Sequence, residues 1–492
     1  MTGGNNFIIF IIMKETVLQK LQSELAPQAD AKIDYEGEHS RHQAQGKDTG
    51  RILIRNAPFI FTCDQNDKTQ ILTGHSLVIE GDTIKAVAPA GQIQEQNFDA
   101  VYDAGKRGGI VITPGFINTH THPPMYLMRS AMMLDEGEGV DETIAAMPRW
   151  EQAMSETDMA LGAIGDITEQ QKHGITTTLS HYHAFAPLEQ ASRLTEQNLI
   201  NAVSVMSNVS PANSPALIEK IISEHANSHS RLAIALHYLY KATPEILTAV
   251  NALVNKYNLL FTCHFAESEQ VAKNCEEKFG MRETGVLKKF NLLNDRTLIS
   301  HAIHVRDEEV KTLAAAGVGI AHLPTSNVIH KSGVFPFWKF FDADGLPYLS
   351  LGTDSVISKS RLDLLSEAYQ TRITHLYDRT VKFSSLFKMM TVNGARILHL
   401  PDRGRIAPGC KADLVFWKLR DRGFIPYDAD EPMTLLGNII THGGRMVRDL
   451  MINGRFVIKN RRHQLIDESK LLQQLQEHHL AMRQRVRPRT LP

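Results

Sequence analysis

A pair of histidines separated by one residue is the strongest chemical signal in this sequence. His120 and His122 follow an apolar, β-branched run at 110–112, and Gly115 is expected to provide a tight turn just before them. Side chains two residues apart on a strand point to the same face, so we expect both imidazoles to project together, about 6–7 Å apart along the strand. Such a pair can bind one cation, and imidazole suits zinc, iron, nickel and copper.

Three more polar residues stand where an apolar, strand-like run ends: His264, His301 and Asp354. In a β/α barrel the carboxyl ends of the strands carry the chemistry, so these residues and the histidine pair would meet at one end of a barrel. We predict four metal ligands: His120, His122, His264 and Asp354. Three or four nitrogen and oxygen ligands with a position left for water are typical of a catalytic site, where the metal lowers the pKa of bound water toward about 7.

Hydrolysis at such a site needs groups that move protons. Glu267 follows His264 by three residues, and we predict that it carries a proton from water to a leaving or ring nitrogen. Asp354 would accept the first proton while it binds the metal. His301 would polarise the substrate or orient the hydroxide.

Each of these residues also has an ordinary explanation, since the chain contains 22 histidines. Asp354 alone could cap the next helix, and Asp363 and Glu367 are expected to face solvent on a helix. Five such residues at the ends of consecutive strand-like runs are harder to explain in this way, so we prefer the catalytic interpretation. Three other histidines are expected to lie behind the ligands or on the surface: His304, His322 and His330.

The block 113–403 has to position these residues, and it alternates short apolar runs with helical stretches. Strands that alternate with helices indicate a parallel sheet. A block of roughly 290 residues suits an α/β fold of the distorted (β/α)8 TIM-barrel type. The alternative is a doubly wound open sheet, which needs a glycine-rich phosphate turn. The stretch 137–142 does not meet that pattern at its last position.

The two flanks of this block are rich in short β-type runs. Residues 51–112 and 404–460 are predicted to combine into one composite β-sandwich, and Asn453-Gly454 is a strong hairpin signal within it. Residues 1–48 form an N-terminal extension in which four apolar residues at helical spacing predict one short helix: Val17, Leu18, Leu21 and Leu25. Residues 461–492 are expected to form a terminal helix with a basic tail.

Composition restricts the classes of partner and the cellular compartment that we expect for the protein. The net charge is −1 and the sequence pI is about 7.1, which argues against nucleic acid or an anionic membrane as a partner attracted by bulk charge. Four cysteines lie far apart, so we expect a reducing, cytoplasmic location. The apolar run 7–13 is too short to span a bilayer, and no basic residue precedes it as in a signal peptide. We expect translation to start at Met13, which would leave 1–12 untranslated.

Several motifs in this chain resemble the amidohydrolase superfamily, and they occur in order at the ends of strand-like runs. They are PGFINTHTH at 114–122, HFAE at 264–267, SHAIH at 300–304, LGTD at 351–354 and GRIAPGCKADLV at 404–415. Within this superfamily, the sequence is most similar to the branch of S-adenosylhomocysteine/methylthioadenosine deaminases and triazine hydrolases. Residues 322–327 and 391–395 also match that branch, and the resemblance covers roughly 51–460.

This resemblance implies a distorted β/α barrel beside a composite β-sandwich. It also implies one divalent metal ion, zinc with iron as the alternative, held by His120, His122, His264 and Asp354. Glu267 and His301 would be the catalytic groups. Members of the branch hydrolyse C–N or C–Cl bonds on heterocyclic rings and are often homodimers or larger assemblies.

The chain departs from the branch at positions that should line the substrate pocket. His237-Tyr238-Leu239-Tyr240 stands where the deaminases usually carry His-Ala-Pro-Tyr, and the loops at 330–333 and 358–360 differ as well. Lys241 is expected on the surface. Four histidines are therefore predicted to bind the substrate: His181, His183, His237 and His330. The substrate itself stays open among purines, pterins, triazines and adenosine derivatives.

Three functions are compatible with these residues and this resemblance. The first is hydrolytic deamination of an aminated heterocycle, and the second is hydrolysis of a cyclic amide or a ring C–Cl bond by the same site. The third is a barrel without catalysis that acts as an assembly subunit. The complete set of candidate ligands argues against the third function.

Overall fold

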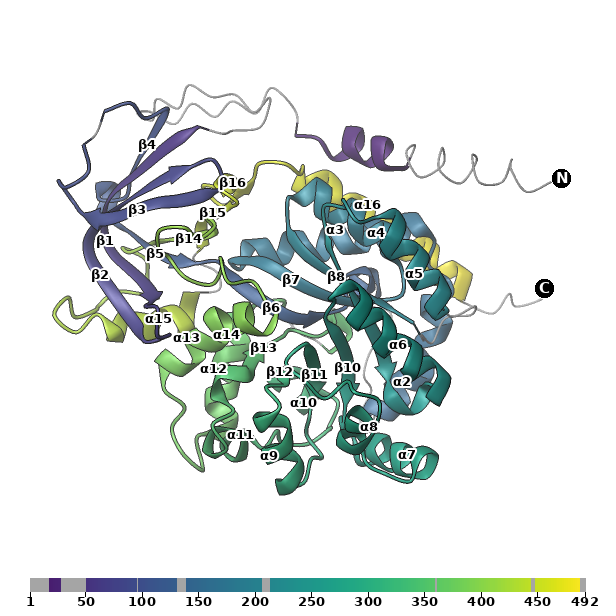
Figure 1. Cartoon of the computed structure of the whole chain (residues 1–492). Helices are drawn as coiled ribbons and strands as arrows, with labels where there is room; N and C mark the ends of the chain where they lie inside the picture. Colours follow the sequence, from purple (N-terminus) through teal and green to yellow (C-terminus); the bar gives the residue numbers. More distant parts are fainter. Residues whose placement is uncertain are drawn as a thin grey trace.

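A computed structural model of the chain (Figure 1) describes residues 17–27, 50–94, 96–130, 139–205, 213–358, 361–443 and 447–486. Four predicted features lie wholly or partly outside these residues: the apolar run 7–13, most of the extension 1–48, the loop at 358–360 and the end of the basic tail. Within the described part of the chain, no helix is long and apolar enough to cross a membrane.

The block behind the predicted site forms a barrel of eight parallel strands that is nearly closed. In chain order, which is also their order in the sheet, they are β6 (Phe116–Thr121), β7 (Ile175–Tyr182), β8 (Asn198–Ser204), β9 (Arg231–Tyr238), β10 (Phe261–Phe265), β11 (Thr297–His301), β12 (Gly319–His322) and β13 (Leu349–Leu351). Nearly all of their residues are buried, as expected for a parallel sheet that is covered on both faces. The α/β-barrel prediction is confirmed.

Helices surround this barrel, and several begin at a hydroxyl side chain. Ser155, Ser214, Thr243 and Ser268 each accept a hydrogen bond from a backbone N–H in the first turn of α3, α5, α6 and α7. The helices are α2 (Val140–Glu151), α3 (Glu156–Lys172), α4 (Phe185–Thr195), α5 (Pro215–Glu224), α6 (Pro244–Tyr257), α7 (Glu269–Phe279), α8 (Glu283–Lys289), α9 (Asp307–Ala315), α10 (Pro324–Ile329), α11 (Phe337–Asp342), α12 (Leu364–His375), α13 (Phe383–Met390), α14 (Val392–Ile397), α15 (Met433–His442) and α16 (Glu468–Val486).

The last strand of the barrel reaches the first through backbone hydrogen bonds beside the predicted site. The N–H groups of Thr353 and Asp354 both donate to the carbonyl oxygen of His120, each at 3.0 Å. Gly352 makes this approach possible, because a Cβ atom there would lie 2.9 Å from the Cβ atom and the carbonyl oxygen of His120. Gly115 has a similar packing role, since a Cβ atom there would lie 2.1 Å from the Thr176 hydroxyl oxygen.

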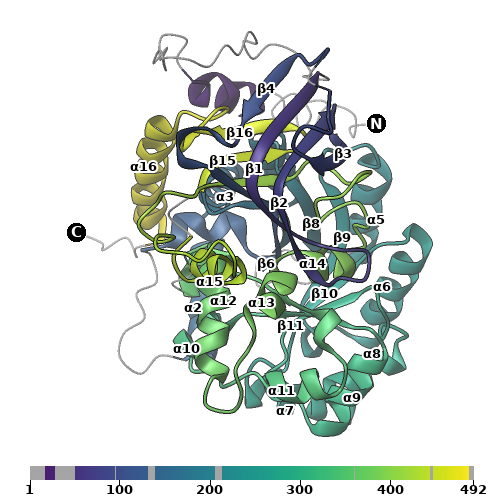
Figure 2. The ribbon, with the colours of Figure 1, turned by 90° about the vertical axis from the view of Figure 1, so that its left-hand side faces the viewer.

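A second, mixed sheet is built from both flanks of the barrel, and Figure 2 shows its early and late strands side by side. Its nine strands are β1 (Arg51–Cys63), β2 (Thr69–Glu80), β3 (Thr83–Pro89), β4 (Ala100–Asp103), β5 (Ile110–Pro114), β14 (Leu414–Lys418), β15 (Val447–Ile452), β16 (Arg455–Lys459) and β17 (Arg462–His463). β5 pairs with β14 in an antiparallel register from Ile110 to Pro114, which joins the two flanks. The predicted turn at Asn453-Gly454 connects β15 to β16, with φ of 49° and 78°.

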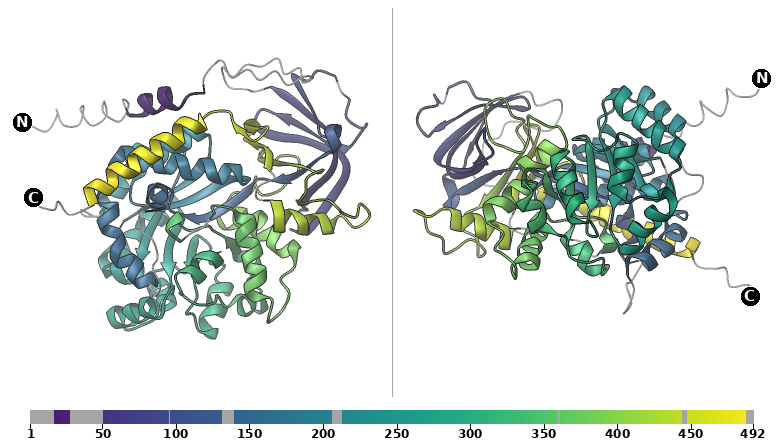
Figure 3. Two further views of the ribbon diagram at one scale, coloured as in Figure 1. Left: turned by 180° about the vertical axis from the view of Figure 1, so that it is seen from behind. Right: turned by 60° about the horizontal axis from the view of Figure 1, so that its bottom comes forward.

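The two ends of the described chain pack against the barrel. A helix at 17–25 buries Leu21 and Leu25 next to α16, and the Leu25 carbonyl oxygen accepts a hydrogen bond from Asp467 N–H at 2.8 Å. α16, the yellow helix in Figure 3, lies along α3. It begins at Glu468 rather than soon after 460, because the chain first completes strand β17.

Candidate active site

The four predicted ligands meet at the carboxyl ends of the barrel strands. The ring centre of His120 lies 4.8 Å from that of His122 and 4.9 Å from that of His264. The Asp354 Oδ1 atom lies 3.3 Å from His122 Nε2 and 3.9 Å from His120 Nε2. Among the described residues, two sets can hold one metal ion, and both contain His120: one adds His122 and Asp354, and the other adds His264 and His301.

The hydrogen bonds of these imidazoles fit a metal ion at their centre. Nδ1–H of His122 donates to the His181 carbonyl oxygen at 2.6 Å, and Nδ1–H of His264 donates to the His237 carbonyl oxygen at 2.9 Å. Because a carbonyl can only accept, the Nε2 lone pair of each ring is left free to bind a metal ion. His120 is fully buried, and within the described part of the chain neither of its ring nitrogens has a hydrogen-bond partner.

Electrostatics keeps His120, His264 and Asp354 in forms that bind a cation, whereas His122 holds a proton toward Asp354 that a metal ion would displace. Burial lowers the pKa values of His120 and His264 well below the usual range, and the neighbouring histidines lower them further, so both rings are neutral. Burial raises the pKa of the Asp354 carboxyl, but the hydrogen bond to His122 and the charges of the nearby histidines hold that pKa well below its usual value. Burial lowers the pKa of His122, but the hydrogen bond and charge of Asp354 outweigh burial and raise it.

Asp354 is held firmly by its surroundings. Its Oδ1 atom accepts from Ser355 N–H at 2.8 Å, and its Oδ2 atom accepts from the Ser326 hydroxyl at 2.6 Å and the Ser358 hydroxyl at 3.3 Å. Its φ of 57° is in the left-handed region, which costs a residue with a side chain about 1–3 kcal/mol. His301 has the same kind of backbone, with a φ of 71°. Such strained residues cluster where the surrounding structure fixes a functional side chain.

Glu267 and His301 face each other beside the ligands. His301 Nε2 lies 3.5 Å from Glu267 Oε2, and His301 Nδ1 lies 3.0 Å from the side-chain oxygen of Asn327. The turn that presents Glu267 is fixed from behind, because the Ala266 N–H donates to Glu283 Oε2 at 2.8 Å. Ala266 has a φ of 44°, so this buried hydrogen bond supports an unusual backbone conformation.

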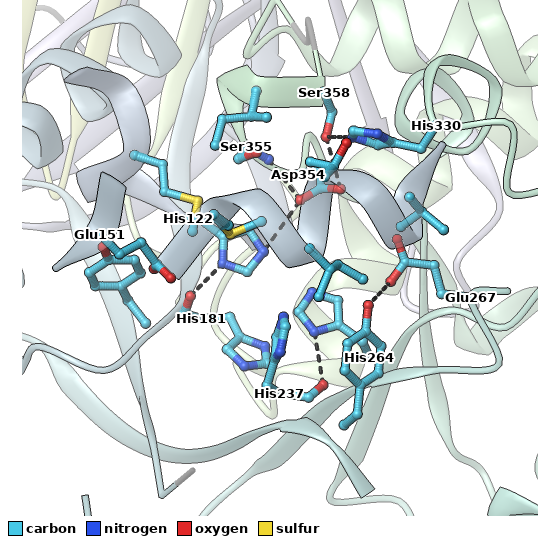
Figure 4. Close-up of a pocket in the computed structure, with 18 of the residues that line it drawn as sticks. His122, Glu151, His181, His237, His264, Glu267, His330, Asp354, Ser355 and Ser358 are labelled. Carbon is cyan, nitrogen blue, oxygen red and sulfur yellow. Dashed lines mark hydrogen bonds and ion pairs between the residues drawn. The ribbon is translucent and has the colours of Figure 1, made fainter. Parts of the chain in front are cut away.

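One pocket is lined by three of the predicted ligands, His122, His264 and Asp354, by Glu267 and by all four predicted substrate-binding histidines, several of which Figure 4 shows pointing into the shared space. His181, His183, His237 and His330 line it from three different strands or loops. His330 is held through a 2.9 Å contact between its Nε2 atom and the Ser358 hydroxyl. One face of α2 also lines the pocket, and its residues there are mostly apolar: Val140, Thr143, Ile144 and Met147.

Glu151 is a pocket residue that the sequence did not reveal. It ends α2, is buried, and has a pKa that burial raises to about 7 in spite of the opposing effects of His122, the Tyr182 hydroxyl and Lys241. The sequence signal was the end of a strand-like run, and Glu151 lies at the end of a helix between β6 and β7. The sequence signal that could have indicated Glu151 is the helical spacing of the apolar residues that precede it on α2.

Several residues lie elsewhere than the sequence indicated. Asp363 and Glu367 do not face solvent, because the α12 face that carries them is turned toward the barrel. Asp363 caps α12 by accepting from Leu365 N–H at 2.9 Å, and Glu367 accepts from Thr325 N–H at 3.1 Å. Lys241 is half-buried, and its Nζ atom donates to His237 Nδ1 at 3.0 Å.

The other histidines are outside the two candidate ligand sets of the described residues. His304 donates from Nε2 to the Ser332 carbonyl oxygen at 2.7 Å. His322 is buried and stacks on Phe335, with ring centres 4.6 Å apart.

Comparison with known proteins places this geometry in a family. A family model described as the amidohydrolase family matches residues 111–457, which is more than half of the chain. The chain belongs to the amidohydrolase family. The family match and the names of the relatives support a hydrolase that acts on C–N bonds.

Two curated relatives are similar over almost their whole length. A 5-methylthioadenosine/S-adenosylhomocysteine deaminase of Pyrococcus furiosus is 29% identical over 86% of this amidohydrolase and 98% of the relative. A 5'-deoxyadenosine deaminase of Methanocaldococcus jannaschii is 28% identical over 87% and 98%.

Solved structures share the fold of this amidohydrolase. An adenosine deaminase of Xanthomonas campestris with bound zinc superposes with a TM-score of 0.79 at 21% identity, covering 88% of this chain and 98% of the other. An atrazine chlorohydrolase of Arthrobacter aurescens in complex with zinc superposes with a TM-score of 0.77 at 22% identity, covering 87% and 100%.

Proposed function

We propose that this amidohydrolase is a mononuclear, metal-dependent deaminase that replaces an amino group on a heterocyclic ring by oxygen and releases ammonia. The observation that carries the proposal is the fully buried His120, whose unpartnered nitrogens lie among three further ligands beside Glu267. The names of the curated relatives, deaminases of adenosine derivatives, support a substrate of purine type. Pterins and triazines carry the same kind of ring amine and are the other candidates.

The metal ion would be held by His120, His122, His264 and Asp354, and zinc is the proposed ion, with iron as the alternative. When bound, it would supply a Lewis acid and lower the pKa of a water molecule toward about 7. Imidazole and carboxylate ligands suit such an ion.

The protein groups would then divide the proton transfers. Asp354 is ionised and can take the first proton from the attacking water. The water loses two protons in this reaction, and Glu267, which lines the pocket, would pass these protons on, first to a ring nitrogen and then to the departing amine, which is a poor leaving group until it is protonated. His301, fixed by Asn327, would orient the attacking oxygen.

The pocket supports a flat, polar ring as the substrate. The apolar face of α2 can cover one face of such a ring, while His181, His183, His237 and His330 offer hydrogen bonds at its edge. We propose Glu151 as a further substrate contact, because it is a buried carboxyl group that lines the same pocket. Lys241 would act indirectly: because it donates to Nδ1 of His237, the proton of that neutral ring lies on Nε2.

Ammonia release tests this function. Zinc-loaded protein would be assayed against aminated purines and their nucleosides, pterins and triazines, together with chloro-substituted and cyclic-amide analogues, with Glu267→Gln as the matched control. We expect at least one aminated ring to yield equal amounts of ammonia and oxo product, with strongly reduced turnover in the control. Turnover restricted to the chloride or amide analogues would replace deamination by that chemistry. A protein that retains no zinc after loading and is inactive on all of them would favour an assembly subunit.

We also propose that the protein works in the cytoplasm as a homodimer or a larger homo-oligomer. The four described cysteines are free and buried, which suits a reducing compartment. We propose the division of the chain into an N-terminal extension 1–48, a composite β unit 51–112 plus 404–460, a catalytic barrel 113–403 and a C-terminal segment 461–492. Light scattering of the purified protein would test the oligomeric state.

A further inference from the structure

Tyr238, at the end of β9, makes a direct contact with the proposed proton carrier. Its hydroxyl donates to Glu267 Oε2 at 2.6 Å, and the side chain is buried in the wall of the pocket. This tyrosine belongs to the segment 237–240, which departs from the His-Ala-Pro-Tyr pattern of the deaminases. Figure 4 shows the hydrogen bond between a phenol ring and Glu267.

The contact makes the two oxygens of Glu267 unequal. Oε2 receives the Tyr238 hydroxyl and is also the oxygen that lies 3.5 Å from His301 Nε2. Within the described residues, no hydrogen bond to Oε1 is formed. A carboxylate with one oxygen held by a short, charge-assisted hydrogen bond cannot rotate freely, so the other oxygen has a defined direction.

The phenol ring is itself fixed. Its centre lies 4.4 Å from the His237 ring, 5.3 Å from the His264 ring and 5.5 Å from the Tyr240 ring, on which it stacks at 20°. A hydroxyl carried on so well packed a ring can fix its partner at little entropic cost.

We propose that Tyr238 is a positioning residue for the deamination reaction: it binds Glu267 Oε2 and thereby leaves Oε1 as the oxygen that carries the proton to the substrate. This inference rests on the proposed function. It adds that proton delivery by Glu267 depends on a second side chain, which is neither a proposed metal ligand nor a group that exchanges protons with the substrate.

The variant Tyr238→Phe keeps the ring and removes only the hydroxyl. We expect it to bind metal normally and to lower kcat by about 10- to 100-fold with little change in KM, since a hydrogen bond to a charged group is lost at the proton carrier. Tyr240→Phe is the matched control: among the described residues Tyr240 is not part of the pocket lining, the variant removes the corresponding hydroxyl from the ring stacked on Tyr238, and kcat should stay within about twofold of the wild type. A crystal structure of Tyr238→Phe should show the Glu267 carboxyl group rotated or in two orientations.

A double-mutant cycle distinguishes positioning from general packing. If Tyr238 acts through Glu267, Tyr238→Phe should change kcat less than about twofold in a Glu267→Gln background. An equal loss of kcat in both backgrounds, or a near-normal kcat in Tyr238→Phe alone, would overturn the inference while leaving the deaminase function intact. A wild type that deaminates no ring would overturn the proposed function, and this inference with it.

Discussion

At the scale of single residues, the site is a set of buried imidazoles that could hold a cation. Neither ring nitrogen of His120 has a hydrogen-bond partner among the described residues, and leaving a buried polar atom unpaired costs about 1–3 kcal/mol. His122 and His264 each use one nitrogen to bind a backbone carbonyl, so their remaining lone pairs face the cluster. A bound divalent ion would satisfy all three rings and offset this cost.

Glu267 belongs to the proton transfers rather than to the ligands in this account. Glu267→Gln should therefore keep its fold and its metal and lose kcat by about 10²–10⁴-fold, or about 3–5 kcal/mol of transition-state stabilisation. Steady-state kinetics and metal analysis on the same samples would check this. A near-normal kcat across the pH range would refute the assignment. Loss of metal would instead place Glu267 among the ligands and move the proton transfer to His301 or Asp354.

At the scale of elements, the position of a residue relative to the ends of the parallel strands explains which site residues could be predicted from the sequence and which could not. His122, His264, His301 and Asp354 could be found because each ends or follows an apolar strand-like run, and strands of a barrel open toward one end. Glu151 lies on a helix inserted after the first strand, where no such rule applies. The orientation of α12 was mispredicted because polar residues on a helix were assigned to solvent, although Asp363 and Glu367 bind backbone N–H groups inside.

Glu283, at the start of α8, accepts the hydrogen bond from Ala266 N–H in the turn that precedes Glu267, and it makes the stability of the protein depend on pH. Burial raises its pKa from 4.5 to about 8. Between these values the carboxyl group is protonated in the folded protein and ionised in the unfolded chain, so the free energy of unfolding falls as the pH rises. Glu283→Gln keeps an acceptor for Ala266 N–H and removes this titration.

The melting temperatures of Glu283→Gln and wild type would be compared at pH 5 and pH 8. We expect the melting temperature of the variant to increase relative to that of the wild type as the pH rises. Glu367 has a pKa that is also raised to about 8, so the melting temperatures of both proteins should still fall somewhat with rising pH. Glu277→Gln, on the exposed side of α7, is the control, and its melting temperature should differ from that of the wild type by the same amount at both pH values. A constant difference between Glu283→Gln and wild type would count against a buried, protonated Glu283.

At the scale of the whole molecule, the barrel and the mixed sheet share one run of chain. β5 of the mixed sheet leads through Gly115 into β6, and the Gly115 N–H donates to the Asp413 carbonyl oxygen at 2.8 Å. The pairing of the two flanks could be predicted because both flanks consist of short β-type runs that border the same barrel. The order of the nine strands, including β4 and β5 parallel to β1, depends on tertiary contacts that local patterns do not encode.

Truncation tests whether the strands of the first flank need those of the second flank to stay folded. Ending the chain at about residue 404 removes β14, whose Leu414, Val415, Phe416 and Trp417 are fully buried, and exposes the apolar face of β5. We expect aggregation of the truncated protein in size-exclusion chromatography. A monodisperse, folded fragment of residues 113–403 would show that the barrel does not need the sheet.

If one metal ion at His120 is required for deamination, activity should follow the zinc content of the protein, and a zinc titration of metal-free protein measures this dependence. Ammonia release from the best aminated ring of the panel would be measured against zinc added per chain, for wild type and for His120→Ala. We expect wild-type activity to rise linearly and to reach a plateau at one zinc per chain, while His120→Ala stays folded, binds little zinc and remains inactive. Full activity without added metal, a plateau at two ions, or an unchanged titration in His120→Ala would contradict this requirement.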